Sequence, residues 1–178
     1  KNISIGTASL PLLKYQPKLF TEEKQARVRL GFIGVGSRGR LHMAEMLKRN
    51  DVDITAVADP DANSILQALD VTQKFGRKSP AAYGKGNTDY KNLLKRDDVD
   101  AVIIASPWEW HLPQSVDAMK AGKAVGVEVC GAMKLQDCWD FVNIYEQTKT
   151  PIMILENVCY RRDIMAVLNM VHQNRFGE

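Results

Sequence analysis

Short, wholly apolar runs alternate along the chain with longer segments whose apolar residues recur at helical spacing. The runs predict strands at residues 28–33, 54–58, 101–105, 124–127 and 152–155. The helical spacing predicts helices over 41–47, 61–76, 113–121, 135–145 and 164–171, with a short one around 93–94. Residues 77–90 are expected to form a loop with a short strand near Tyr83. Strands that are apolar on both faces and alternate with amphipathic helices indicate a parallel sheet covered on both sides, the α/β class.

Composition excludes several classes of protein without changing this picture. The chain has 178 residues, 45% of them hydrophobic and 25% charged, which is typical of globular proteins. Its 24 Lys and Arg are interspersed among 21 Asp and Glu, for a net charge of +3, and form no basic stripe. Nucleic acid is therefore not an expected partner. No apolar run approaches the roughly 20 residues of a membrane span.

The three cysteines, Cys130, Cys138 and Cys159, are an odd number without C-x-x-C spacing. This pattern favours buried free thiols over a disulfide framework or a metal site.

The first 27 residues are treated apart from the fold. Residues 2–13 are mildly apolar and nearly uncharged, and they resemble the apolar part of a secretory signal of the twin-arginine type. Residues 14–27 are polar and predict a linker. Export to the periplasm is one expectation. The alternative is a plain N-terminal arm on a cytoplasmic protein.

A glycine-rich turn follows the first predicted strand. Residues 34–39 match G-x-G-x-x-G and open the first helix, the context in which this motif binds a dinucleotide. Gly34 would permit the tight turn, Gly36 the approach of a pyrophosphate, and Gly39 close packing of helix on strand. The N–H groups around Ser37 and Arg38 would face the phosphates. The alternative is a glycine-rich connection without a ligand.

Asp59 ends the second predicted strand, where an acidic residue binds the adenosine ribose. A carboxylate there repels a 2′-phosphate, so NAD is favoured over NADP. Two alternatives stay open. Asp59 could instead cap the next helix, although Asp61 can already do so, and Arg38 could accept a 2′-phosphate.

These motifs, with "DDVDAVIIASP" and "AGKAVGVEV" further along, resemble the Gfo/Idh/MocA oxidoreductase superfamily. The resemblance implies a Rossmann-type doubly wound parallel sheet as the N-terminal half of a two-domain enzyme. Members usually carry Glu-Lys-Pro after the fifth strand, and the Lys assists hydride transfer. This chain has Glu128-Val129-Cys130 instead, so the expected catalytic cation of an ordinary dehydrogenase is missing.

Three further stretches resemble the NAD-dependent α-N-acetylgalactosaminidases of glycoside hydrolase family 109. They are residues 108–111, 128–132 and 156–163, each at the end of a predicted strand. The resemblance implies cofactor contacts for Trp108, Glu109, Trp110, His111, Glu128, Val129 and Asn157, and places Tyr160 near the substrate. No residue is identified as the catalytic base.

Each of these residues also has an ordinary structural interpretation. Trp108 and Trp110 could be core or rim aromatics, and His111 a helix cap. Glu128 could be a solvated carboxylate and Asn157 a turn residue. Tyr160 could make an interdomain contact.

The resemblance also implies a reaction without net redox change. NAD⁺ takes hydride from the 3-hydroxyl carbon of the sugar, which acidifies the C2 proton. Loss of that proton expels the anomeric substituent, water adds, and the hydride returns. The expected partner is a small glycoside or a glycan terminus, with a homo-oligomer left open.

By this resemblance, residues 28–157 are an NAD-binding Rossmann domain. Residues 158–178 would be a connecting helix into a C-terminal substrate domain that lies beyond the 178 residues, so the chain alone is expected to be inactive. The alternatives are an NAD-dependent sugar or cyclitol dehydrogenase, and a non-catalytic NAD-binding module.

Overall fold

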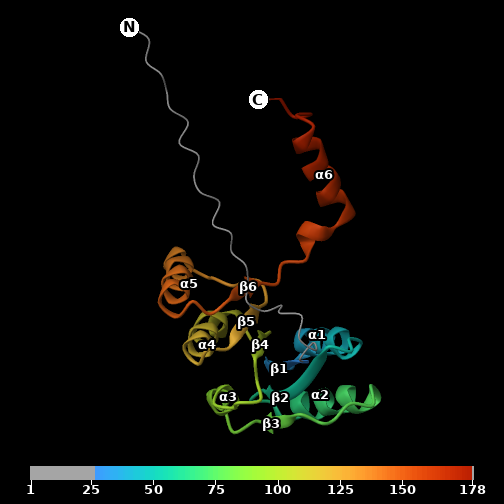
Figure 1. Cartoon of the computed structure of the whole chain (residues 1–178), viewed down its shortest axis with the longest axis vertical. Coiled ribbons are helices and arrows are strands. Elements are labelled where there is room, and N and C mark those ends of the chain that lie inside the picture. Colours follow the sequence, from blue (N-terminus) through green and yellow to red (C-terminus); the bar gives the residue numbers. More distant parts are fainter. Residues whose placement is uncertain (1–26, 178) are drawn as a thin grey trace.

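A computed structural model describes residues 27–177, which form a six-stranded, fully parallel sheet with helices on both faces (Figure 1). The strand order is β3-β2-β1-β4-β5-β6. The strands are β1 (Val28–Ile33), β2 (Val52–Ala58), β3 (Ala81–Tyr83), β4 (Ala101–Ile104), β5 (Ala124–Val127) and β6 (Ile152–Ile154). The predicted α/β class with a Rossmann-like doubly wound sheet is confirmed. The expectations for residues 1–26, including the export signal, lie outside the described residues.

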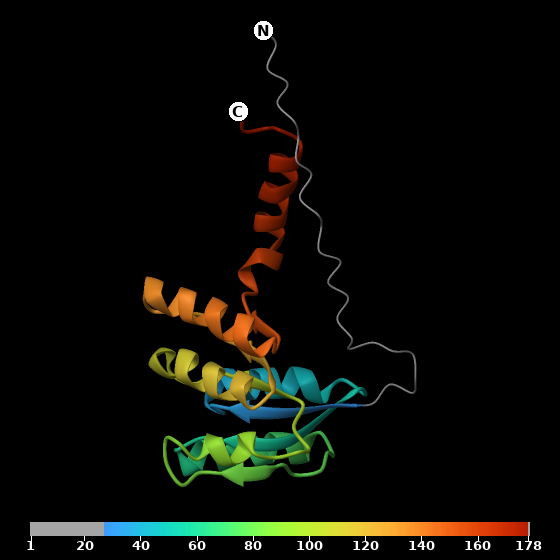
Figure 2. The same cartoon turned by 60° about the vertical axis from the view of Figure 1, so that its left-hand side comes forward.

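The helices sort onto the two faces of the sheet. In Figures 1 and 2, α1 (Ser37–Leu47) and α2 (Ala62–Lys74) cover one face. The other face is covered by α3 (Tyr90–Leu94), α4 (Trp108–Lys120) and α5 (Leu135–Thr148). Each layer encloses its own core, since Phe32, Met43 and Ala68 pack together on one side and Leu93, Val102 and Met119 on the other. The wholly apolar strands are explained by this double burial.

The register aligns the carboxyl ends of the central strands. Ile33 of β1 pairs with Ala58 of β2 on one side and with Ile104 of β4 on the other. The chain order reverses between β1 and β4, and open α/β sheets bind ligands at such a switch point. The loops after β1, β2 and β4 therefore meet at one place.

Helix α4 begins five residues earlier than the sequence predicts. It starts at Trp108, and Pro113 lies inside it. The prediction placed Pro113 in the first turn, where proline is favoured. Instead, Pro107 is the N-cap, with extended backbone (φ −56°, ψ 148°). Because proline has no N–H, the helix lacks one i→i−4 hydrogen bond at Pro113. The segment 108–111 is consequently helical.

The expectation of buried thiols is wrong for two of the three cysteines. Cys138 and Cys159 are exposed, and Cys130 is partly buried with its Sγ 2.6 Å from the Ala132 carbonyl oxygen. Cys138 lies on α5 and Cys159 in the short 3-10 helix η1 (Val158–Tyr160), and neither segment is covered by another layer on that side.

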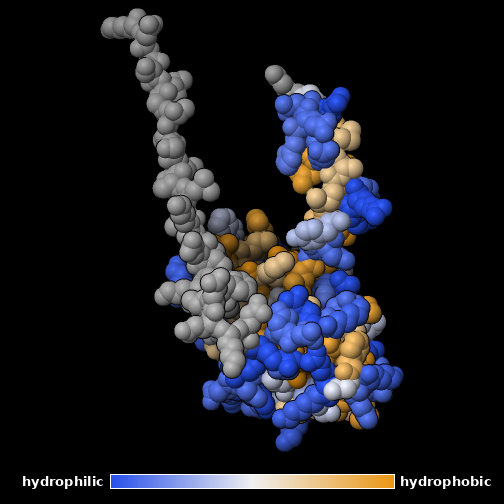
Figure 3. Space-filling model, turned by 45° about the vertical axis from the view of Figure 1, so that its right-hand side comes forward, coloured by the Kyte–Doolittle hydropathy of each residue, from blue (hydrophilic) through white to orange (hydrophobic). Residues whose placement is uncertain are grey.

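The last helix, α6 (Arg162–His172), projects from the sheet beyond β6 and η1 (Figures 1 and 2). None of its residues is buried. Figure 3 shows hydrophobic and hydrophilic side chains side by side on this helix. Its exposed apolar residues are Ile164, Met165, Val167, Leu168, Met170 and Val171. In the described part of the chain, none of the helices combines the length and the apolar character needed to span a bilayer.

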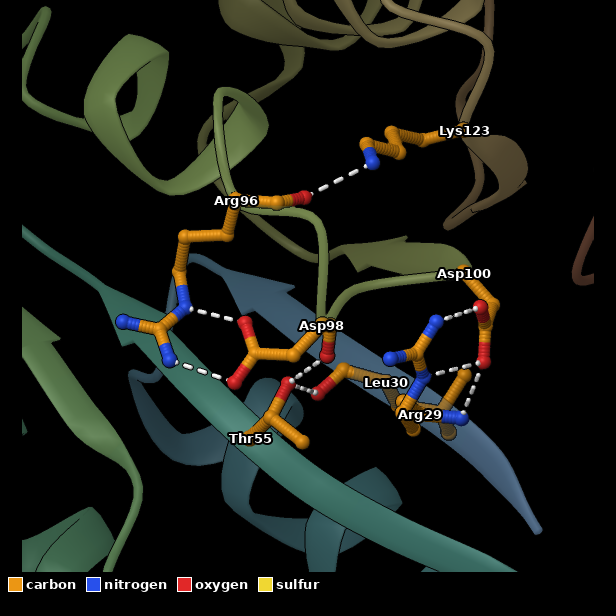
Figure 4. Close-up of polar contacts among 7 residues, drawn as sticks. All are labelled: Arg29, Leu30, Thr55, Arg96, Asp98, Asp100 and Lys123. Carbon is orange, nitrogen blue, oxygen red and sulfur yellow. Dashed lines mark hydrogen bonds and ion pairs between the residues drawn. The ribbon is translucent and has the colours of Figure 1, made fainter.

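At the amino-terminal edge of the sheet, a polar network joins β1, β2 and β4 (Figure 4). The Asp100 carboxylate accepts hydrogen bonds from the backbone N–H of Arg29 (2.9 Å) and from its guanidinium (2.6 and 3.0 Å). The Thr55 hydroxyl donates to the carbonyl of Asp98 (2.9 Å). This network lies at the opposite edge of the sheet from the switch point and stabilises the fold.

Candidate functional site

A cavity of about 510 Å³ opens at the switch point, at the carboxyl ends of β1, β2 and β4. The predicted residues that line it are Gly34, Gly36, Ser37, Arg38, Asp59 and Trp110. Gly39 is buried directly beneath the turn. The structure thus brings together the residues predicted to hold the adenosine and pyrophosphate half of a dinucleotide.

The three glycines of the turn differ in what a side chain would meet. Gly34 has φ +82°, and a Cβ there would lie 2.5 Å from the backbone nitrogen of Ser106. At Gly39 a Cβ would lie 2.1 Å from the Gly34 carbonyl oxygen. At Gly36 it would meet no protein atom within 4 Å. These differences match the three roles of the glycines in the G-x-G-x-x-G motif: a tight turn, an open approach for a ligand, and close helix–strand packing.

Ser37 and Arg38 are the first two residues of α1, with Gly36 as N-cap. No side chain caps this helix terminus. The backbone N–H groups of the first turn therefore remain as donors, at the positive end of the helix dipole. An anion such as a pyrophosphate fits this terminus.

Asp59 also braces the glycine turn. Its Oδ2 accepts the Val35 N–H at 2.8 Å and its Oδ1 accepts the Asp61 N–H at 2.9 Å. Asp61 is the N-cap of α2, accepting hydrogen bonds from the backbone of Asn63 and Ser64. The capping role is thus taken by Asp61, and Asp59 faces the cavity.

Arg38 is directed away from Asp59. Its Nε donates to Oε1 of Glu128 at 2.7 Å. Glu128 follows β5, whereas Asp59 follows β2 on the other side of β1 and β4. This geometry does not favour the alternative in which Arg38 accepts a 2′-phosphate beside Asp59.

Glu128 is a buried carboxylate, not the solvated one of the ordinary interpretation, with a side chain 6% exposed. Its Oε1 also contacts Nε2 of His42, and its Oε2 accepts the Val129 N–H at 3.2 Å. Burial raises the pKa of Glu128, but hydrogen bonds from His42 and Arg38 outweigh it and leave the pKa below its ordinary value. Glu128 is therefore an anion at neutral pH.

Residues 108–111 occupy the first turn of α4, and their side chains diverge. Trp110 lines the cavity, whereas Trp108 is 58% exposed and Glu109 lies on the surface. His111 is buried, with its two ring nitrogens 2.8 Å from the carbonyl oxygens of Cys130 and Ser106. Through these two contacts His111 joins the loops after β4 and β5. The cofactor contact implied for His111 stays a prediction.

The remaining predicted residues lie outside the cavity. Val129 is 38% exposed after β5, Asn157 precedes η1, and Tyr160 is 73% exposed within it. They follow β5 and β6, on the side of the sheet where a nicotinamide would extend if the adenosine half filled the cavity.

Sequence reasoning missed several residues of this region, among them His42, Asn87, Tyr90 and Gln114. Asn87 and Tyr90 belong to the segment after β3, whose position beside β2 follows only from the strand order. The Tyr90 hydroxyl donates a hydrogen bond to the Asp117 carboxylate at 2.7 Å. Burial is the larger cause that raises the pKa of Tyr90, and this hydrogen bond is the second. Gln114 accepts from the Ser106 hydroxyl at 2.6 Å. The signal for His42 is its i+4 spacing from Arg38.

The hydrogen-bonding groups around the cavity suit an organic anion rather than a metal ion. Among residues 27–177, His, Cys, Asp and Glu side chains do not gather in threes as a metal site would require. Backbone N–H groups, an arginine and a carboxylate at the end of β2 fit a dinucleotide.

Comparison with known proteins agrees with this site. Residues 28–155 match the Gfo/Idh/MocA family model, described as an oxidoreductase family with an NAD-binding Rossmann fold. A glycosyl hydrolase family 109 protein from Stenotrophomonas maltophilia is 46% identical over 85% of this chain and 34% of its own length. An alpha-N-acetylgalactosaminidase from Tannerella forsythia is 43% identical over 92% of this chain and 35% of its own. The chain thus spans about a third of the length of these relatives.

Solved structures share the fold at lower identity. Scyllo-inositol dehydrogenase from Lactobacillus casei, with bound NAD(H) and scyllo-inositol, has a TM-score of 0.71 at 19% identity, over 85% of this chain and 43% of that one. The WlbA dehydrogenase from Chromobacterium violaceum has a TM-score of 0.72 at 19% identity, over 85% and 41%. With the family match over residues 28–155, the glycine turn and Asp59 at the switch point establish that the chain belongs to the Gfo/Idh/MocA oxidoreductase family, through its NAD-binding Rossmann domain.

Proposed function

We propose that this chain is the cofactor-binding part of an NAD-dependent glycosidase that removes terminal α-N-acetylgalactosamine. The observation that carries the proposal is the identity of 43–46% to relatives named as family 109 glycosyl hydrolases and as an alpha-N-acetylgalactosaminidase. The segment Glu128-Val129-Cys130 supports it, because it lacks the lysine that a superfamily dehydrogenase uses.

The chain's own residues would bind and orient the cofactor. The first turn of α1 and Arg38 would hold the pyrophosphate, and Asp59 would accept hydrogen bonds from the adenosine ribose hydroxyls. Trp110 would form one wall of the cavity. When bound, NAD⁺ supplies the temporary acceptance and return of hydride that the proposed reaction needs. NAD is preferred to NADP in this proposal, because Asp59 would repel a 2′-phosphate.

We further propose that residues 28–157 form the cofactor domain and that residues 158–178 lead into a substrate domain. The exposed apolar side chains of α6 support this division, since such a helix face ordinarily packs against a partner surface. On this proposal, the 178 residues bind NAD but do not turn over a glycoside.

Two measurements test the proposal. Calorimetric titration of the 178-residue chain should show NAD binding with one site. The full-length protein should release nitrophenol from a nitrophenyl α-N-acetylgalactosaminide without accumulating NADH. Absence of release at any NAD concentration would contradict the glycosidase. Stoichiometric NADH from a free sugar or cyclitol would instead favour the dehydrogenase, and NAD binding without either activity would favour a binding module.

A further inference from the structure

The buried Glu128 carboxylate is shared between two donors on one face of α1. Arg38 and His42 are four residues apart, so their side chains lie one above the other on that helix. Both reach the same oxygen, Oε1, Arg38 through Nε at 2.7 Å and His42 through Nε2. The side chains are 6% exposed at Glu128, 22% at His42 and 44% at Arg38, and of the three Arg38 lines the cavity.

The protonation of this contact follows from the carboxylate. Because the pKa of Glu128 is lowered by its partners against the effect of burial, the group is ionised at neutral pH and can only accept hydrogen bonds. The Nε2 of His42 must therefore carry a hydrogen and donate it. With Val129 N–H on Oε2, the carboxylate is fixed from three directions.

The contact between Arg38 and Glu128 has an unusual geometry for an arginine–carboxylate pair. An arginine and a carboxylate with no other partners favour a bidentate fork, in which two guanidinium N–H groups face both oxygens. Here Arg38 contacts Glu128 through Nε alone, at the oxygen that His42 also contacts, while the Val129 N–H approaches Oε2. Arg38 also lines the cavity, and among residues 27–177 neither of its Nη groups donates to a protein acceptor.

We infer that His42 is a positioning residue for pyrophosphate recognition: by donating to Glu128 it keeps Arg38 on a single Nε contact, with its outer N–H groups directed to the ligand. This inference rests on the proposed binding of NAD. Without the His42 donor, the carboxylate is expected to draw the guanidinium into the fork and away from the phosphates.

The test compares ligands that do and do not carry phosphates. His42→Leu should lower the affinity for NAD and for ADP about tenfold, the loss of one charge-assisted contact. The affinity for adenosine, which reaches only the Asp59 side, should stay unchanged. His42→Gln should restore NAD affinity, because its amide can donate to Glu128 without being charged. His172→Leu, an exposed histidine of α6, is the matched control and should leave all three affinities unchanged.

A double-mutant cycle tests whether His42 acts through Arg38. In an Arg38→Ala background, His42→Leu should cause no further loss of NAD affinity. Equal loss for NAD, ADP and adenosine, or a large fall in Tm, would assign His42 a merely structural role and overturn the inference. Unchanged NAD binding in His42→Leu would overturn it as well. If the wild-type chain bound no NAD, the proposed function and the inference would both fail.

Discussion

At the residue scale, the glycines of the β1–α1 turn are distinguished by what a methyl group would meet. A Cβ at Gly36 would meet open space, whereas a Cβ at Gly39 would lie 2.1 Å from the Gly34 carbonyl oxygen. On the proposed function, the first position would be constrained by the ligand, whereas the second is constrained by the fold. A pair of alanine substitutions separates these constraints.

Gly36→Ala should leave the free energy of unfolding within about 1 kcal/mol of wild type, since its backbone (φ −61°, ψ −163°) suits an L-residue. Its NAD affinity should fall at least about tenfold, because the methyl group occupies the approach to the pyrophosphate. Gly39→Ala should instead lower stability by about 2 kcal/mol or more. Thermal unfolding and calorimetric titration measure the two effects. Normal NAD affinity in Gly36→Ala would place the pyrophosphate elsewhere.

Asp59 is the residue that we expect to set the preference for NAD over NADP. Asp59→Ser removes the negative charge that would repel a 2′-phosphate, so the ratio of NADP to NAD affinity should rise about tenfold or more. Asp61→Asn removes a neighbouring charge while keeping a good N-cap, and should leave the ratio unchanged. Titration of each variant with both dinucleotides gives the ratio. A similar shift in both variants would mean that general charge, not the Asp59 position, sets the preference.

At the scale of elements, the network at the amino-terminal edge holds β1, β2 and β4 in register (Figure 4). Hydrogen bonds from the Arg29 guanidinium hold the pKa of Asp100 below its ordinary value, although burial opposes them. A carboxylate with a lowered folded-state pKa stabilises the fold above its unfolded-state pKa. That stabilisation is lost as the pH falls through the folded-state pKa.

Asp100→Asn should therefore destabilise the chain by about 0.5–1 kcal/mol at pH 7, a small figure because the pair is half-exposed and screened by solvent. The difference from wild type should be fully present above about pH 4 and shrink at lower pH. Urea unfolding at several pH values measures it. Asp70→Asn, in an exposed pair with Lys74, is the control and should change little. A difference that grew on acidification would contradict the assignment.

The elements were predictable where the hydrophobic pattern repeats strongly. The apolar runs located five of the six strands of the sheet, and the glycine turn and Asp59 located the edge that carries the cavity. The start of α4 was not predictable, because Pro107 and Pro113 can both begin a helix and the packing of Trp110 against the core cannot be read from the sequence. The partners of Glu128 were hidden as well, since His42 lies 86 residues away in sequence. The contacts of His111 were not predictable, because its partners are backbone carbonyl oxygens, which no motif encodes.

At the scale of the whole molecule, α6 adds no buried residue to the sheet-and-helix body. A chain ending at residue 157 should therefore unfold cooperatively, with a Tm within a few degrees of the 178-residue chain, and bind NAD equally well. Differential scanning calorimetry and titration provide the comparison. A large loss of Tm would show that residues 158–178 belong to the folding unit, and would contradict the proposed domain boundary.

The sheet ends on both sides in strands of three residues, β3 and β6. A row of unpaired backbone groups at a sheet edge is a template for pairing with other molecules, and very short edge strands are one protection against it. This brevity limits aggregation by sheet extension even though Met153 and Ile154 of β6 are apolar and exposed. If the chain self-associates in concentrated solution, we expect the molecules to contact one another through exposed helix faces such as α6. The infrared signal of intermolecular β-structure should then not increase with concentration.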